Sequence, residues 1–179
     1  MQERQLIDRV LAGDAAAERA LYDGHVDRVF RLAHRMTGDE TLAQDFTQET
    51  FIRAFDRLPS FRGDAALSTW LHSITMSVVL NGLRKVKRHR QRETDLDGAR
   101  GVGADPKGDP VLRSALAHAI DQLSDDHRAV LLLHDVEGFK HAEIATIMAI
   151  PIGTSKARLA RARAALRRDL VSFAPEWTS

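Results

Sequence analysis

Six basic side chains lie between Lys156 and Arg168, near the end of the chain. Lysine and arginine bind backbone phosphates, and arginine also reads base edges in the major groove of DNA. If this segment is a helix, Thr154, Arg158 and Arg161 share a face with Arg168, opposite an apolar stripe. The chemistry that this pattern favours is recognition of duplex DNA. A basic amphipathic surface helix with no nucleic-acid partner is the alternative.

A helix-turn-helix is the element that would position these basic residues. The inward stripe of the basic helix is expected to comprise Ile152, Leu159, Ala162, Leu166 and Leu170. A shorter helix is expected just before it, with a tight turn at Pro151. Thr154 can serve as the N-cap or lie in the first turn, where free N–H groups suit a phosphate.

A second group of polar residues lies on a helix expected from about 40 to 58. Phe46, Phe51 and Phe55 form its inward face. The opposite side carries Asp45, Gln48, Glu49 and Asp56. Two neighbouring carboxylates are used for acid–base catalysis or metal binding. A solvated helix face is the usual explanation of such a pair, and a protein-docking patch is a third option, so the spacing leaves these alternatives open.

The loop at 61–68 and the helix after it form a third group. Phe61 lies in this loop and Trp70 follows it, while residues 84–92 contain six basic and no acidic side chains. An aromatic loop beside a basic helix can hold unstacked bases. Alternatively, Phe61 and Trp70 belong to a hydrophobic core.

The composition favours an all-α protein and excludes several chemistries. Hydrophobic residues make up 44% of the 179 residues, and β-branched alternation is nearly absent. There are no cysteines, which excludes disulfides, thiolate metal sites and a cysteine nucleophile. The eight histidines show no metal-ligand spacing, so we expect neither metal nor cofactor. We see no signal peptide and no apolar run long enough to span a membrane, and therefore expect a cytoplasmic protein without membrane contact.

The glycine- and proline-rich stretch at 93–110 predicts a flexible linker between two small helical domains, 1–92 and 111–179. Gly38 and Gly138 are expected to end helices, and Ser124 to cap one. The expected helices are 3–12, 15–37, 40–58 and one from about 68 in the first domain, then 111–123, 125–137, 141–148 and 153–171 in the second.

Together these stretches resemble the extracytoplasmic-function sigma factors, the small two-domain type of bacterial transcription initiation factor. The matching segments are DFTQETFIRAF (45–55), FRGDAALSTWL (61–71), LSDDHRAVLLLHDVEGF (123–139), EIA (143–145) and IPIGTSKARLARARAALR (150–167). The resemblance implies a region 2-like domain at 1–92 and a region 4-like helix-turn-helix domain at 111–179.

The resemblance also implies roles for matching positions. Asp45, Gln48 and Glu49 correspond to the face that docks on core RNA polymerase. The loop at 61–68 and the following helix correspond to the reader of the promoter −10 element, and the helix from about 153 to the reader of the −35 element. The implied DNA-binding residues are Phe61, Arg62, Ser68, Ser77, Arg84, Lys85, Lys87, Arg88, Thr154, Ser155, Lys156, Arg158 and Arg161.

Some positions depart from the family pattern. Met76, Ser77 and Asn81 stand where the family commonly has Arg, Asn and Asp. Lys140 stands where a capping Ser or Thr is usual, and Ser155 replaces a usual Val. The short Ser77 side chain suggests that −10 recognition relies mainly on the loop.

The function predicted from the sequence is that of an alternative sigma factor, not an enzyme, held in check by an anti-sigma factor. A sigma-like decoy that titrates an anti-sigma factor is the main alternative. A one-component helix-turn-helix repressor would not explain Asp45, Gln48 and Glu49. A hydrolase would need a second convergent polar cluster, which the sequence lacks.

Overall fold

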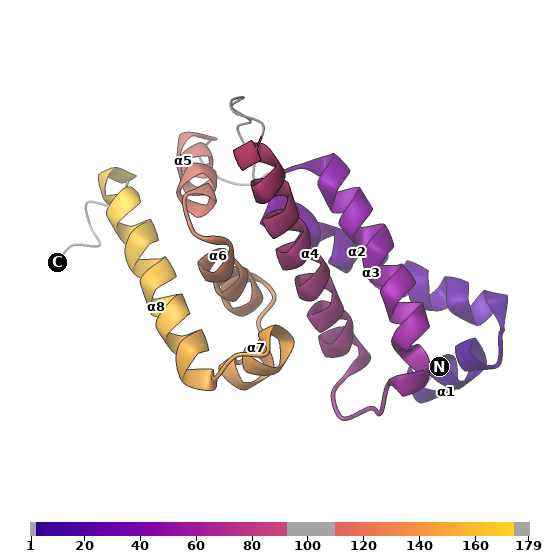
Figure 1. The fold of residues 1–179 in the computed structure, drawn as a ribbon. Helices are drawn as coiled ribbons and strands as arrows, with labels where there is room; N and C mark the ends of the chain where they lie inside the picture. Colours follow the sequence, from indigo (N-terminus) through magenta and orange to yellow (C-terminus); the bar gives the residue numbers. More distant parts are fainter. Residues whose placement is uncertain (1–2, 93–109, 174–179) are drawn as a thin grey trace.

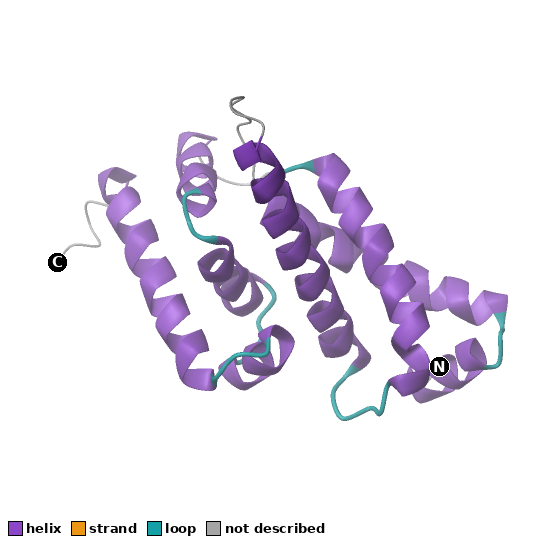
Figure 2. Cartoon of the chain, viewed as in Figure 1, coloured by secondary structure: helices purple, strands orange, loops and turns teal. Residues whose placement is uncertain are grey.

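The computed structural model describes residues 3–92 and 110–173, and every regular element in these two stretches is helical (Figures 1 and 2). The predicted all-α class is confirmed. The N-terminal half (3–92) contains α1 (Glu3–Leu11), α2 (Ala15–Thr37), α3 (Glu40–Arg57), the short η1 (Leu58–Ser60) and α4 (Leu67–Arg92). The C-terminal half (110–173) contains α5 (Pro110–Asp121), α6 (Asp125–Leu131), η2 (Leu132–Val136), α7 (His141–Met148), α8 (Ile152–Asp169) and η3 (Val171–Phe173). The linker predicted at 93–110 lies outside the described residues except for Pro110.

The helix ends follow local side-chain chemistry. Asp14 accepts hydrogen bonds from the first turn of α2. Ser124, the cap predicted from the sequence, accepts one from the His127 N–H at the start of α6. Gly38 ends α2 in the left-handed conformation, with φ 63°. The helix predicted at 125–137 instead changes from α to π geometry at Leu132 before Gly138, where φ is 78°.

One hydrophobic core belongs to the N-terminal half alone. This first core lies among α1, α2, α3 and α4. Its buried members are Ile7, Val10, Ala17, Leu21, Val29, Phe51, Ala54, Leu58, Leu67, Leu71, Ile74 and Val78. Burial of this many large apolar side chains gives the half a core of its own.

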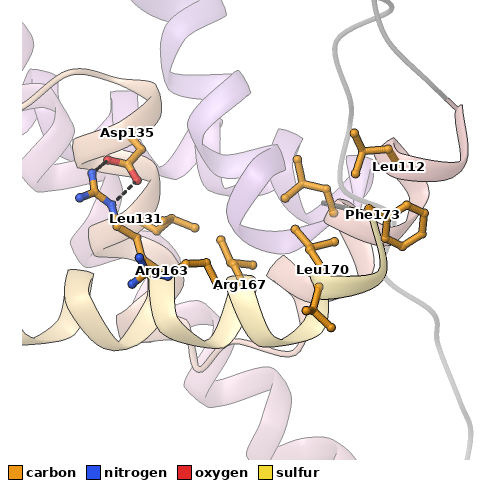
Figure 3. A pocket seen from close by; sticks show the side chains of 10 residues that line it. Leu112, Leu131, Asp135, Arg163, Arg167, Leu170 and Phe173 are labelled. Carbon is orange, nitrogen blue, oxygen red and sulfur yellow. Dashed lines mark hydrogen bonds and ion pairs between the residues drawn. The ribbon is translucent and has the colours of Figure 1, made fainter. Parts of the chain in front are cut away.

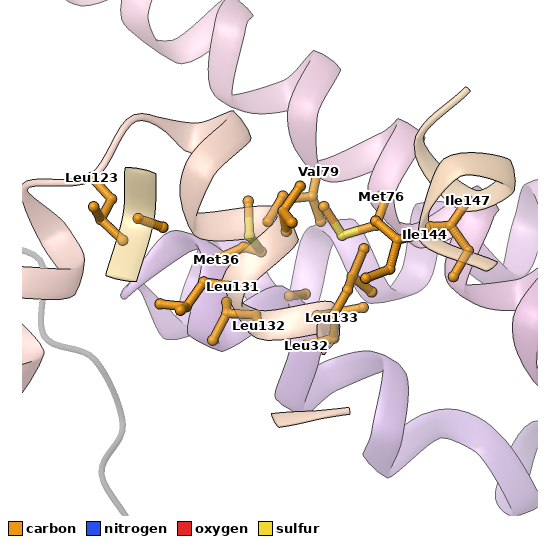
Figure 4. Close-up of a cluster of buried hydrophobic side chains, with 14 of the residues drawn as sticks. Leu32, Met36, Met76, Val79, Leu123, Leu131, Leu132, Leu133, Ile144 and Ile147 are labelled. Carbon is orange, nitrogen blue, oxygen red and sulfur yellow. The ribbon is translucent and has the colours of Figure 1, made fainter. Parts of the chain in front are cut away.

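A second core is built from both halves, and we call it the shared core (Figure 4). From the N-terminal half it buries Leu32, Ala33, Met36, Ala43, Met76, Val79 and Leu83. From the C-terminal half it buries Leu123, Ala129, Val130, Leu131, Leu132, Leu133, Ile144, Ile147, Leu159 and Ala162. The two predicted domains therefore pack directly on each other, because α4 is apolar on two sides.

Helix α4 also lies very close to α3. A Cβ added at Gly82 would collide with the ring of Phe46. Glycine at this position lets the Phe46 ring lie directly against the backbone of α4. The close approach fixes α3, which carries the acidic residues, relative to α4, which carries the basic stretch.

Candidate nucleic-acid interface

The apolar stripe of α8 differs from the prediction at its first position. Leu159 and Ala162 are buried and Leu166 and Leu170 are partly buried, as predicted, but Ile152 is 47% exposed. Ile152 is the first residue of α8 and extends beyond the surface against which the helix packs. Ser155, one turn later, is fully buried and takes the first place of the stripe.

The Ser155 side chain does not reach the surface. Its hydroxyl lies 2.9 Å from Nδ1 of His141, at the start of α7. This contact joins the two helices of the helix-turn-helix. We therefore remove Ser155 from the expected DNA contacts, since its spacing from Leu159 and Ala162 places it on the inward face of α8.

The remaining predicted residues of α8 lie at or near the surface. Lys156 and Arg161 are exposed, while Thr154 and Arg158 are partly buried. Arg158 forms an ion pair of 2.8 Å with Asp126 of α6. Thr154 lies in the first turn and does not cap the helix, whose N-cap is Pro151 with no side-chain cap.

The turn between α7 and α8 places Ala149 in the left-handed region, with φ 52°. A side chain with a Cβ is strained there, and glycine is not. At the other end of α7, Lys140 supplies no side-chain acceptor, as predicted, since an ammonium only donates. Glu143 compensates in part, because its carboxylate accepts the Lys140 N–H at 2.8 Å.

The loop before α4 and the first turns of that helix hold the next group of predicted DNA contacts. Phe61 packs against Trp70, with ring centroids 5.1 Å apart, and both are partly buried beside the first core. Arg62 is exposed and Ser68 is partly exposed. Phe61 therefore combines a packing role with a position at the edge of the loop.

Ser77 and the basic end of α4 lie on the outer sides of this helix. Ser77 is exposed, whereas the adjacent Met76 is fully buried in the shared core. The side chains of Arg84, Lys85, Lys87 and Arg88 are exposed. Lys87 is nevertheless engaged, since its ammonium lies 2.6 Å from Asp125 of α6.

The polar face of α3 is open to solvent. Asp45 and Gln48 are exposed, and Glu49 is partly exposed and forms an ion pair of 2.6 Å with Arg53. Ile52 lies on the same face and is 51% exposed. Sequence reasoning missed Ile52, although its spacing from Gln48 and Asp45, four and seven positions away, places it on this side. An apolar side chain surrounded by charges is typical of a protein-binding surface.

A further feature missed from the sequence is an apolar groove of about 500 Å³ on the C-terminal half (Figure 3). Leu112, Leu116 and Leu170 contribute to its walls, and Phe173 lies at one end. At the other end Arg163 donates to both carboxylate oxygens of Asp135, at 3.0 and 2.5 Å. These hydrogen bonds from Arg163 hold the pKa of Asp135 below its ordinary value. Arg163 thus faces α6 and η2, unlike Arg161.

Two features of the described residues bear on alternative functions. Within 3–92 and 110–173, no group of three or more His, Asp or Glu side chains is arranged to hold a metal ion. None of the helices in these stretches combines the length and apolar character required to cross a bilayer.

The family comparisons match both halves of the chain. Residues 21–89 match the family described as Sigma-70 region 2, and residues 113–166 match the family described as Sigma-70, region 4. The chain is 32% identical to the ECF RNA polymerase sigma factor SigW of Bacillus subtilis, covering 95% of this chain and 97% of SigW. It is 35% identical to the RNA polymerase sigma-H factor of Pseudomonas aeruginosa, covering 94% of each. It is also 34% identical to SigE of Mycolicibacterium smegmatis, of which it spans 66%.

Two solved structures share the fold. One is the sigma factor RpoE in complex with the anti-sigma factor NepR from Bartonella quintana, with a TM-score of 0.72, 24% identity and coverage of 85% of this chain and 95% of that chain. The other is CnrH in complex with the cytosolic domain of CnrY, with a TM-score of 0.69, 24% identity and coverage of 95% and 97%.

Proposed function

Because the chain belongs to the extracytoplasmic-function sigma factors of bacterial RNA polymerase, we infer that it binds core RNA polymerase and directs transcription initiation at promoters. The polymerase supplies the chemistry, so we propose no catalytic role for any residue of this chain. Its place of action is then the cytoplasm, where core polymerase and promoter DNA are found.

The proposed polymerase contact is the outer face of α3. Asp45, Gln48 and Glu49 carry it, with Ile52 as an added apolar contact. Its support is an exposed polar face with an exposed isoleucine among the charged and polar groups. A charged rim around a small apolar centre is how many protein interfaces are built.

The proposed promoter contacts lie on α4 with the loop before it, and on α8. Arg62, Ser68 and Ser77, with Phe61 at the loop edge, serve the −10 element, supported by Arg84, Lys85, Lys87 and Arg88. Thr154, Lys156, Arg158 and Arg161 serve the −35 element. Arginine can bind guanine edges or phosphates, whereas lysine binds phosphate as a point charge.

We also propose that an anti-sigma factor restrains this chain. The support is that the RpoE and CnrH structures are complexes, the first with an anti-sigma factor and the second with the cytosolic domain of CnrY. A decoy that binds such a factor without initiating transcription is the second candidate, and the departures at Met76, Ser77 and Asn81 favour it. Transcription by the purified chain with core polymerase separates the two.

The test of the docking face is a double charge reversal, Asp45→Lys with Glu49→Lys. We expect core polymerase binding to fall by about 2 kcal/mol or more, since a docking hot spot is lost. The melting temperature should change little, because these side chains are exposed and surface substitutions usually shift stability by about ±0.5 kcal/mol. Asp8→Lys with Glu18→Lys makes the same charge change on exposed residues of α1 and α2 and is the control. Unchanged core binding in the Asp45/Glu49 variant would refute the docking assignment.

A further inference from the structure

The loop between η1 and α4 runs between two buried residues of the first core (Figure 2). Leu58 of η1 is 2% exposed, and Leu67, the first residue of α4, is fully buried. Between them, Gly63 takes a left-handed φ of 75° and Arg62 is exposed. The shape of this surface loop therefore depends on how its two ends are held.

The start of the loop is held by residues close to it in sequence. The Phe61 N–H donates to the Leu58 oxygen at 3.0 Å. The Phe61 ring packs on Trp70 of α4, with ring centroids 5.1 Å apart, and both rings lie beside the first core. This end of the loop is thus fixed by the elements that flank it.

The two residues directly before α4 cannot cap the helix. The first backbone hydrogen bond of α4 runs from the Trp70 N–H to the Ala66 oxygen at 3.1 Å. The N–H groups before Trp70 have no acceptor within the helix, and an N-cap Ser, Thr, Asp or Asn usually accepts one of them. Here Ala65 and Ala66 precede Leu67, and alanine has no side-chain acceptor.

The acceptor comes instead from α1, 64 residues away in the sequence. A carboxylate oxygen of Glu3 accepts the Leu67 N–H at 3.1 Å. A carboxylate also interacts favourably with the partial positive charge at a helix N-terminus. Ile7 and Val10 of α1 are buried in the same core as Leu67, so the packing of α1 holds Glu3 beside the end of the loop.

Helix α2 lies near the same carboxylate. Burial lowers the pKa of His25 of α2, the charge of Arg28 lowers it further, and the negative charge of Glu3 opposes both. Glu3 thus lies where α1, α2 and the start of α4 come together. Glu3 is nevertheless exposed to solvent. Its replacement therefore removes the hydrogen bond to α4 without leaving a cavity in the first core.

We propose that Glu3 is a positioning residue for −10 recognition: it caps α4 from another helix and holds the loop in the shape that receives an unstacked base. This inference rests on the proposed function, because it presupposes that the loop reads the −10 element. Glu3 needs no contact with DNA, since it acts through the Leu67 N–H. That N–H belongs to the backbone that carries Arg62 and Ser68. A loop that must become ordered on binding binds more weakly than one already in place.

The first arm of the test measures the cap without any promoter. Glu3→Ala removes the acceptor, whereas Glu3→Gln keeps an oxygen in the same place. Asp8→Ala is the control, because Asp8 is an exposed carboxylate on the same helix. Amide hydrogen exchange of the full chain, followed by NMR, reports the Leu67 N–H. We expect its exchange to be about fivefold faster in Glu3→Ala and little changed in Glu3→Gln and Asp8→Ala. Unchanged exchange in Glu3→Ala would overturn the inference.

The second arm measures strand opening with core polymerase, on a template whose promoter sequences the chain itself has selected. Permanganate reactivity of unpaired thymines reports the open complex. We expect about fivefold fewer open complexes with Glu3→Ala, recovery of most of this loss with Glu3→Gln, and no loss with Asp8→Ala. Affinity for core polymerase and the melting temperature should stay as in the wild type, which separates positioning of the loop from folding of the domain.

Two further results have distinct meanings. Strand opening by Glu3→Ala that equals the wild type, or a loss that Glu3→Gln does not recover, would overturn the positioning role. If the wild type opens no selected template while the Leu67 N–H still responds to Glu3→Ala, the proposed function is what fails, and the −10 role of Glu3 fails with it.

Discussion

The first core and the shared core contain similar residues but differ in what depends on them. The first core is enclosed by α1 to α4 and needs nothing from the C-terminal half. The shared core exists only while α2 and α4 touch α6 and α7. The same helix, α4, faces both cores, with Leu71 in one and Met76 in the other. One core therefore maintains a domain, whereas the other maintains an arrangement of domains.

The largest effect is expected from Leu71→Lys. Leu71 is 1% exposed in the first core, so the charge has no route to water without unfolding. We expect a loss of about 4 kcal/mol or more, comparable to the whole stability of a small domain. Thermal unfolding by circular dichroism measures it. A variant that melts like the wild type would contradict the assignment of Leu71 to an independent core.

Met76→Lys is the matched change in the shared core. Met76 is fully buried, but separation of the halves would expose it to water. The cost is therefore limited to the free energy that keeps the halves together. We expect retained helicity with reduced fluorescence energy transfer between dyes attached at Ala20→Cys in α2 and Ser114→Cys in α5, two exposed positions in different halves. Loss of helix as complete as in Leu71→Lys would show that the two cores do not differ in this way.

The sequence predicted the elements better than their assembly. The spacing of apolar residues predicted the helices, and Ser124 and Gly38 predicted two of the helix ends. Both signals act locally in the sequence. The shared core was missed, since α4 reads as one amphipathic helix and its second apolar side has no partner nearby in sequence. Ile52 was missed because a single exposed isoleucine carries no periodic signal.

In the candidate site too, features set by local helical spacing were predicted better than contacts between helices. Lys156 and Arg161 are exposed as expected, since their side of α8 follows from helical spacing. Ser155, expected among the DNA contacts, is buried in the apolar stripe, whereas Ile152, expected in the stripe, is exposed. The residue at which the stripe begins depends on where α7 ends. The pairing of Arg158 with Asp126 joins residues far apart in sequence, and no spacing predicts it.

A smaller effect is expected within the helix-turn-helix. Ala149 holds a left-handed conformation that costs an alanine about 1 kcal/mol relative to glycine. Ala149→Gly should raise the stability of the C-terminal half by about that amount in chemical denaturation. Gly153→Ala is the control. Gly153 lies inside α8 without a left-handed backbone conformation, and the added carbon would have open space around it. A destabilised Ala149→Gly variant would argue against this turn geometry.

Asp126→Asn tests the acidic residue that pairs with Arg158 of α8. Removing the carboxylate frees Arg158 for phosphate, so duplex DNA binding should strengthen about two- to fivefold. The slope of log affinity against log salt should steepen by about one. Anisotropy titrations at several salt concentrations measure both. Adding Arg158→Ala should abolish the gain, and persistence of the gain would assign it to general charge instead.

The smallest effect is expected when the pH is lowered. His72, the Arg35 guanidinium and Arg28 hold the pKa of Glu137 below its ordinary value of 4.5, against the opposing effect of burial. Glu137 pairs with Arg35 of the N-terminal half. A carboxylate with a lowered folded-state pKa stabilises the contact between the halves above pH 4.5, and this stabilisation is lost as the pH falls through the lowered value. The difference in energy transfer between wild type and Glu137→Gln should therefore shrink with acid. A difference in energy transfer that grows as the pH falls would contradict the lowered pKa of Glu137.

Run-off transcription from a duplex promoter template, with purified core polymerase and this chain as the added factor, tests the account most directly. We predict promoter-dependent transcripts with the wild type and with Asp8→Lys/Glu18→Lys. The Asp45→Lys/Glu49→Lys variant should yield none. The template must carry −10 and −35 sequences selected by the chain itself from a randomised library. A wild type that binds core polymerase but yields no transcript from any selected template would contradict the sigma-factor function and favour the decoy.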